Sequence, residues 1–186
     1  VDSGLTETIC QKLASQIDSL IEDLNGEISQ VSDQPFDVQK RDKAGKPVLT
    51  RTGLPSFHTR NIFQLASDDL QSKYPDTYCP PLTDKGNLQT AEDAWRGYAD
   101  HPVLRVYFAI KQNIKLQGLI KVVEDQSRIH PSYGYLTKTG RTSCSGPNIQ
   151  QVPKDDVIRR CYMASEGHVL IACDYAQLEL ATLAQT

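Results

Sequence analysis

Apolar residues recur at helical spacing near the start of the chain. They are separated by three or four positions, as one face of an α-helix requires: Leu5, Ile9, Leu13, Ile17, Leu20, Ile21, Leu24 and Ile28. This spacing predicts one long amphipathic helix over residues 5–29.

Residues 37–61 follow, with little periodicity and several basic side chains. Turn signals stand at Ala44-Gly45-Lys46-Pro47 and at Thr52-Gly53-Leu54-Pro55. Because Gly and Pro interrupt regular structure, we expect an irregular basic insertion that contains a short hairpin.

Three further helical segments are predicted before residue 125. Ser67-Asp68-Asp69-Leu70 is typical of the start of a short helix, and Thr90-Ala91-Glu92-Asp93 of a capped start to another. Residues 101–123 carry apolar side chains around much of the helix circumference, with Pro102 in the first turn. They predict a well-buried helix of about six turns.

The character of the sequence changes after Asp125. Residues 128–154 are rich in Ser, Thr, Gly and Pro and predict short strands and turns with polar side chains. Residues 157–164 and 168–173 are strand candidates, and residues 176–185 are helix formers. Helices followed by a small sheet predict an α+β fold.

Composition narrows the class of protein. The 186 residues have room for one domain or parts of two, no apolar run is long enough to span a membrane, and the first residues do not resemble a signal peptide. Five scattered cysteines without a Cys-x-x-Cys pair favour free thiols in a reducing cytoplasm. The four histidines lack metal-ligand spacing.

Charge is unevenly distributed along the chain. The net charge is −3, yet residues 102–154 hold eight Lys and Arg against Glu124 and Asp125. Such a basic zone in an acidic protein marks either a polyanion-binding face or a solvated helix face, and charge alone leaves both open.

Asp174 follows the apolar or small residues 169–173 and precedes the helix-forming residues. An acid at such a strand end suits a Mg²⁺ ligand, because Mg²⁺ prefers oxygen donors. The alternative is a helix N-cap without further function.

Two segments resemble signatures of the family A DNA polymerases. Residues 139–153, Thr-Gly-Arg-Thr-Ser-Cys-Ser-Gly-Pro-Asn-Ile-Gln-Gln-Val-Pro, are similar to that family's TGR segment. Residues 174–180, Asp-Tyr-Ala-Gln-Leu-Glu-Leu, are similar to its motif A. The resemblance implies a helical thumb region over residues 1–125 and the first part of an antiparallel palm sheet over residues 126–186, an incomplete polymerase domain.

The resemblance implies roles for the motif A residues. Asp174 would be one of two palm aspartates that hold two Mg²⁺ ions, and the backbone carbonyl of Tyr175 would be a further ligand. Glu179 would exclude the ribose 2′-hydroxyl, and Gln177 would line the nucleotide and primer–template groove. The substrates would be deoxynucleoside triphosphates.

Contacts to primer–template DNA are also implied. Arg141 would grip the minor groove at the primer terminus, and Asn148 and Gln150 would offer amides to bases or sugars. Lys111 and Lys115, four apart on one helix face, would meet phosphates. We expect Tyr133 and Tyr135 to be packed within a strand rather than to stack on bases.

The sequence also departs from the family pattern. Ala181 stands where the family has Arg, and the fingers motif and second palm carboxylate are not among these residues. We therefore expect a fragment that does not polymerise alone, from a bacterial or phage-infected cell. The sequence identifies no processivity partner.

Two alternatives remain open. One is a non-catalytic nucleic-acid-binding module derived from a polymerase, which would bind duplex in a salt-sensitive manner without Mg²⁺. The other is an unrelated α+β structural protein in which Asp174 only caps a helix.

Overall fold

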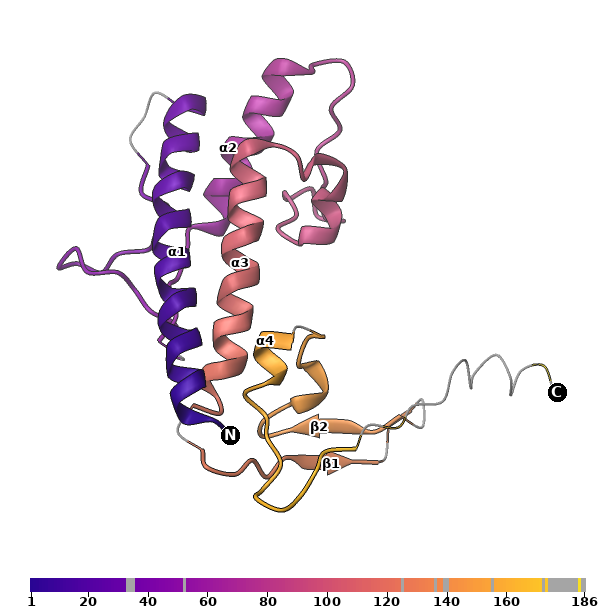
Figure 1. The fold of residues 1–186 in the computed structure, drawn as a ribbon. Helices are drawn as coiled ribbons and strands as arrows, with labels where there is room; N and C mark the ends of the chain where they lie inside the picture. Colours follow the sequence, from indigo (N-terminus) through magenta and orange to yellow (C-terminus); the bar gives the residue numbers. More distant parts are fainter. Residues whose placement is uncertain are drawn as a thin grey trace.

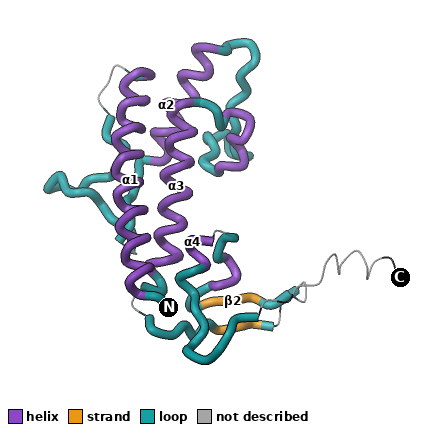
Figure 2. The backbone as a smooth tube through the Cα atoms, viewed as in Figure 1, coloured by secondary structure: helices purple, strands orange, loops and turns teal. Residues whose placement is uncertain are grey.

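The structure, a computed structural model, consists of a helical bundle above a small sheet (Figure 1). It describes residues 1–32, 36–51, 53–124, 126–135, 137–138, 141–154, 156–171, 173 and 184. The helices α1 (Ser3–Val31), α2 (Thr59–Lys73) and α3 (Pro102–Lys121) make up most of the bundle, as the tube view also shows (Figure 2). None of the helices in this described part combines the length and apolar character needed to cross a membrane.

Helix α1 forms as its sequence predicts. The Asp2 carboxylate accepts a hydrogen bond from the Leu5 amide at 2.9 Å and caps the helix. The predicted apolar face is buried except for Leu5 and Leu20, which are half-buried, and α3 runs antiparallel beside it (Figure 1). Buried Gln117 of α3 donates from Nε2 to the Cys10 carbonyl of α1 at 3.3 Å, which adds a polar contact to this interface.

An aromatic core lies between α1, α2, α3 and the 3₁₀-helix η1 (Glu92–Tyr98). Trp95 and Phe63 are fully buried with ring centroids 5.1 Å apart, and Tyr107 meets Phe63 edge-on. The polar atoms of these rings are paired: Trp95 Nε1 donates to the Gln89 carbonyl at 2.8 Å, and the Tyr107 hydroxyl shares a hydrogen bond with Thr59 at 2.8 Å. The core therefore fixes η1 and α3 against α2 without leaving those groups unsatisfied.

The predicted insertion at 37–61 is largely a compact meander, and α2 begins within its last residues. Isolated antiparallel bridges join Gln39 to Phe57, Arg41 to Pro47, and Leu49 to Pro55. The turns fall at the two Gly-Pro-containing sites that the sequence marks, which confirms the hairpin-like character. Helix α2 starts at Thr59, so the prediction that a helix starts at Ser67 was wrong: Ser67 is buried in the middle of α2.

The small sheet lies below the helical bundle in the view of Figure 1. Strands β1 (Ser132–Gly134) and β2 (Ser143–Ser145) pair antiparallel, with Tyr133 opposite Cys144. The 3₁₀-helix η2 (Ile149–Gln151) and the short helix α4 (Asp156–Arg159) follow. A second apolar cluster joins this region to the bundle; its buried members are Ile9, Cys10, Leu13, Ile120, Ile158 and Cys161.

Two strand predictions were wrong. The structure has α4 and a turn within residues 157–164, and residues 168–171 lie outside any strand, with Val169, Leu170 and Ile171 exposed by 79%, 71% and 81%. A strand needs a hydrogen-bonded neighbour, and β1 and β2 pair only with each other among the described residues. The predicted helix 176–185 falls almost wholly outside the described residues.

Candidate nucleic-acid interface

The β1–β2 pair positions Arg141 just before β2. A side chain at position 134 would place its Cβ 2.7 Å from Ser143 Oγ, so glycine allows the close approach of the two strands. The Thr137 hydroxyl donates a hydrogen bond to the Arg141 carbonyl, which fixes the backbone there. The side chain of Arg141 is exposed on this connection.

The segment after β2 holds Asn148 and Gln150 in one ordered turn. Asn148 caps η2 by accepting from the Gln150 amide at 3.2 Å. Gln150 Nε2 donates to Thr142 Oγ1 at 3.0 Å, which ties η2 to the residue that follows Arg141. Hydrogen bonds thus connect the turn that holds Asn148 and Gln150 to Thr142, which follows Arg141. Both amide side chains take part in these hydrogen bonds.

Lys111 and Lys115 lie on a different element. Both are exposed and four residues apart on α3, as predicted. Arg105 is a further exposed cation of this helix, and Lys121 is half-buried near its end. Because α3 has no acidic residue, its exposed charge is wholly positive.

Tyr133 and Tyr135 differ from the expectation of strand packing. They are exposed by 45% and 71%. Tyr133 lies in β1, which pairs only with β2 in the described part of the chain, and Tyr135 follows the end of that strand. The packing prediction was therefore wrong for both residues.

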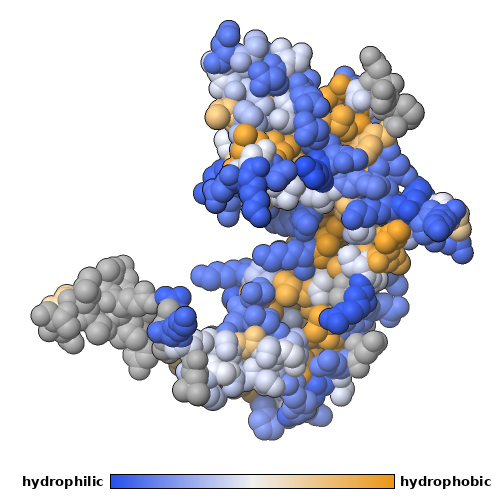
Figure 3. All heavy atoms as spheres, turned by 180° about the vertical axis from the view of Figure 1, so that it is seen from behind, coloured by the Kyte–Doolittle hydropathy of each residue, from blue (hydrophilic) through white to orange (hydrophobic). Residues whose placement is uncertain are grey.

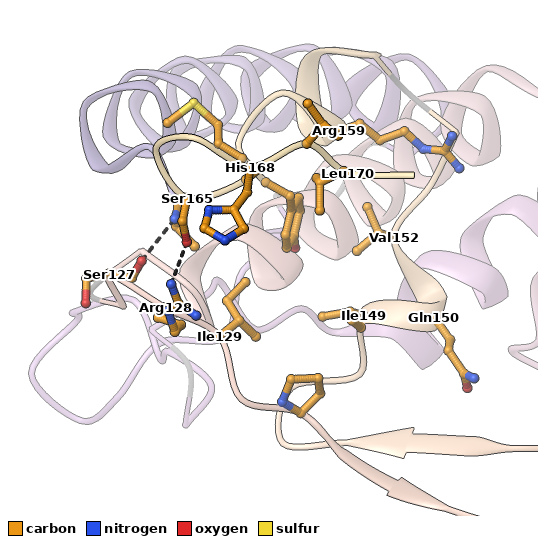
Figure 4. A pocket seen from close by; sticks show the side chains of 16 residues that line it. Ser127, Arg128, Ile129, Ile149, Gln150, Val152, Arg159, Ser165, His168 and Leu170 are labelled. Carbon is orange, nitrogen blue, oxygen red and sulfur yellow. Dashed lines mark hydrogen bonds between the residues drawn. The ribbon is translucent and has the colours of Figure 1, made fainter. Parts of the chain in front are cut away.

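A cavity of about 860 Å³ lies beside η2 and was not anticipated from the sequence (Figure 4). Ile129, Ile149 and Val152 line it from one side, and Leu170 and His168 from the other. Figure 4 shows the Gln150 amide directed away from its centre. The only sequence signal for this cavity is the apolar run that was assigned to a strand at 168–173.

Polar contacts hold the rim of the cavity. Arg128 donates to the Ser165 hydroxyl, and Arg159 Nε donates to the Pro153 carbonyl at 3.1 Å. The chain's amino terminus donates to the Ser127 carbonyl at 3.1 Å. These guanidinium groups therefore have structural partners.

The thiols near this region are poor nucleophiles. Burial, followed by the nearby Glu124 carboxylate, raises the pKa of Cys10 to about 11. Burial also raises the pKa of Cys161. Both thiols stay protonated near neutral pH, so they serve as small apolar residues of the second cluster.

The predicted metal and nucleotide residues Asp174, Tyr175, Gln177 and Glu179 lie outside the described residues. Within the described ranges, no group of three or more His, Cys, Asp or Glu side chains is placed to hold a metal ion.

The fold and sequence together define the class. Over 91% of its length the chain superposes, with a TM-score of 0.54 and 23% identity, on 27% of a solved chain described as the POL domain of Pol1 from M. smegmatis in complex with DNA primer-template and dNTP. The fold is thus that of part of a polymerase domain.

The family model for DNA polymerase family A matches residues 7–186. The chain belongs to DNA polymerase family A. It is 27% identical to the thermostable DNA polymerase I of Thermus filiformis over 188 residues, which cover 95% of this chain and 20% of that protein.

A second relative is the DNA polymerase I of Lactococcus lactis subsp. cremoris, 30% identical over 147 residues that cover 68% of this chain and 17% of that protein. The chain therefore spans about a fifth of the length of the curated relatives it matches.

Proposed function

We propose that the chain is part of a DNA-directed DNA polymerase, a nucleotidyltransferase that adds deoxynucleotides to a primer 3′ end on a DNA template. The observation that carries this proposal is the family match over residues 7–186, which includes both the Arg141 segment and the Asp174 motif. Residues 1–125 would form the thumb-like region and residues 126–186 part of the palm. Bacterial relatives favour the cytoplasm of a bacterial or phage-infected cell.

Asp174 and the backbone carbonyl of Tyr175 would hold Mg²⁺. Both supply oxygen donors, which Mg²⁺ prefers, so the donor chemistry fits the ion. When bound, two Mg²⁺ ions would activate the primer hydroxyl and neutralise phosphate charge. The chain's own contribution would be to hold Asp174 in place, to exclude a ribose 2′-hydroxyl with Glu179, and to line the nucleotide and primer–template groove with Gln177.

Arg141 would contact the duplex at the primer terminus. Its exposed guanidinium and its fixed backbone support this role, because a planar fork can bind acceptors common to all base pairs. Asn148 and Gln150 hold the turn that follows β2 and would present their remaining amide atoms to the same groove. Lys111 and Lys115 would meet backbone phosphates from α3.

Primer extension tests this proposal. The 186 residues alone should not extend a primer, because the motif residues among them provide one of the two carboxylates. In the complete polymerase, Asp174→Asn should lower the rate of primer extension roughly 10³-fold or more, since it removes a metal-ligand charge at the reacting centre. The matched control is Asp155→Asn, which removes an acid outside motif A.

Equal activity of Asp174→Asn and the Asp155→Asn control would contradict the assigned role. Salt-sensitive duplex binding by a complete protein that never extends a primer, with or without Mg²⁺, would favour the non-catalytic binding module.

A further inference from the structure

The meander of residues 37–58, here called the basic meander, concentrates positive charge in an acidic protein. It holds five Lys and Arg against two Asp, while the whole chain has a net charge of −3. The cations are all exposed; they are Lys40, Arg41, Lys43, Lys46 and Arg51.

Both carboxylates of the basic meander are engaged within it. Asp37 pairs with the Arg41 guanidinium and accepts from the Gln39 amide at 3.0 Å. Asp42 Oδ1 accepts from the amides of Ala44 and Lys46 at 2.8 and 2.9 Å, which shapes the turn. Across the described ranges of the chain, no carboxylate forms an ion pair with the side chains of Lys43 or Lys46.

A ring of three backbone hydrogen bonds closes the base of this element. The Lys40 amide donates to the Ser56 carbonyl, Ser56 donates to Val48, and Val48 donates to Lys40, at 2.8, 3.0 and 2.7 Å. Each of the three residues therefore donates once and accepts once. The two turns lie between these residues in the sequence. The hydrogen-bonded ring therefore holds the backbone from which the exposed lysines extend.

The basic meander is also anchored to the bundle. Val38, Leu54 and Phe57 are buried, and Gly118 of α3 leaves room for Leu54, whose Cδ1 lies 3.4 Å from where a Cβ would be. Lys121 Nζ lies 3.5 Å from the Gly53 carbonyl. The turn at 50–53 thus meets α3, whereas the turn at 42–46 protrudes (Figure 1) and forms part of a largely hydrophilic projection seen from behind (Figure 3).

We propose that the protruding turn of the basic meander, residues 40–46, is a second electrostatic contact for the phosphates of duplex DNA, separate from the Arg141 segment. The inference rests on the proposed function, which makes DNA the polyanion. It adds a surface that the motif residues do not include.

The composition of the turn favours a phosphate backbone over an acidic protein. Residues 40–46 read Lys-Arg-Asp-Lys-Ala-Gly-Lys and expose no large apolar or aromatic side chain. Stable protein interfaces depend on such anchors in a desolvated centre. Evenly spaced phosphates need only mobile point charges, and each neutralised phosphate releases counterions.

Salt-dependent binding of a labelled duplex by the 186-residue protein tests the proposal. Lys43→Gln combined with Lys46→Gln should reduce the slope of log affinity against log salt concentration by about 1.8, because two phosphate contacts are lost. The matched control, Lys12→Gln with Lys85→Gln, removes the same charge from exposed positions outside the basic meander and should leave the slope unchanged. Both pairs should melt like the parent protein.

A third variant, Arg141→Ala, distinguishes the meander contact from the proposed DNA site at Arg141. If Arg141→Ala weakens binding while the Lys43 and Lys46 pair behaves like its control, the meander contact is overturned and the proposed DNA site stands. If only the meander pair acts, the contact stands and the Arg141 assignment fails. A protein without duplex affinity at low salt would overturn both.

Discussion

Asp69 links α2 to the residue that precedes α3. Its Oδ2 lies 2.9 Å from His101 Nε2 and 2.7 Å from Lys73 Nζ. Burial raises the pKa of Asp69, but the hydrogen bonds from Lys73 and His101 outweigh burial and hold that pKa below its ordinary value. The ionised carboxylate therefore stabilises the fold above the unfolded pKa of about 3.9, and this stabilisation is lost as the pH falls through the folded pKa.

Asp69→Asn should reduce the free energy of unfolding by roughly 2 kcal/mol at neutral pH, because charge-assisted hydrogen bonds are lost. The difference from the parent protein should shrink as the pH falls below about 4 and through the lowered pKa of the folded carboxyl, where Asp69 becomes protonated. Urea denaturation followed by the emission of the buried Trp95 measures both effects. Exposed Asp68→Asn is the control, and an undiminished difference at low pH would contradict the assignment.

At the scale of elements, the periodic spacing of apolar residues correctly predicted the helices that pack against one another, α1 and α3. The spacing from Leu5 to Ile28 predicted α1 almost to its ends, and Pro102 marked the first turn of α3 correctly. Helix α2 was predicted too short because its first buried residues, Ile62 and Phe63, follow the irregular meander directly. A polar cluster at residues 67–69 looked like a helix start but lies inside the helix.

The two wrong strand predictions show that a run of apolar residues does not by itself predict a strand. Residues 168–173 have the composition of a buried strand, yet strand formation depends on a partner elsewhere in the polypeptide. Tyr133 of β1 is likewise exposed, because β1 pairs only with β2 among the described residues. The sequence predicted which residues belong to the candidate site. It did not predict the hydrogen bond between Gln150 and Thr142, which joins residues eight apart and depends on how the chain folds back.

The α1–α3 interface should dominate the stability of the bundle. Leu24 of α1 is fully buried in the aromatic core, so Leu24→Ala should lower the free energy of unfolding by about 3 kcal/mol. Ser19→Ala on the exposed face of α1 should change it by less than about 0.5 kcal/mol. Urea denaturation compares the two, and equal small effects would mean that Leu24 does not pack as described.

At the scale of the whole molecule, apolar surface is concentrated beside the cavity. Val169, Leu170 and Ile171 are consecutive and mostly exposed, unlike the scattered apolar residues of an ordinary surface. Contiguous apolar surface promotes association in water, because burying it is favourable.

The isolated 186-residue chain should therefore self-associate as its concentration rises, and Val169→Ser combined with Ile171→Ser should reduce that association. Light scattering over a concentration series measures it. Leu49→Ser, which removes a single exposed apolar residue from the basic meander, is the control and should have little effect. Unchanged association in the double variant would assign the contact to another surface.

The hydrogen-bond ring of Lys40, Val48 and Ser56 has a consequence for how this region can vary. The three residues are spaced eight apart, and each uses its own backbone, so the ring does not depend on the side chains in the turns between them. Residues can be exchanged or inserted at the protruding turn of residues 42–46 while the junction and the path from α1 to α2 stay in place. Evolution can therefore change the charge and length of this surface loop without disturbing the surrounding fold.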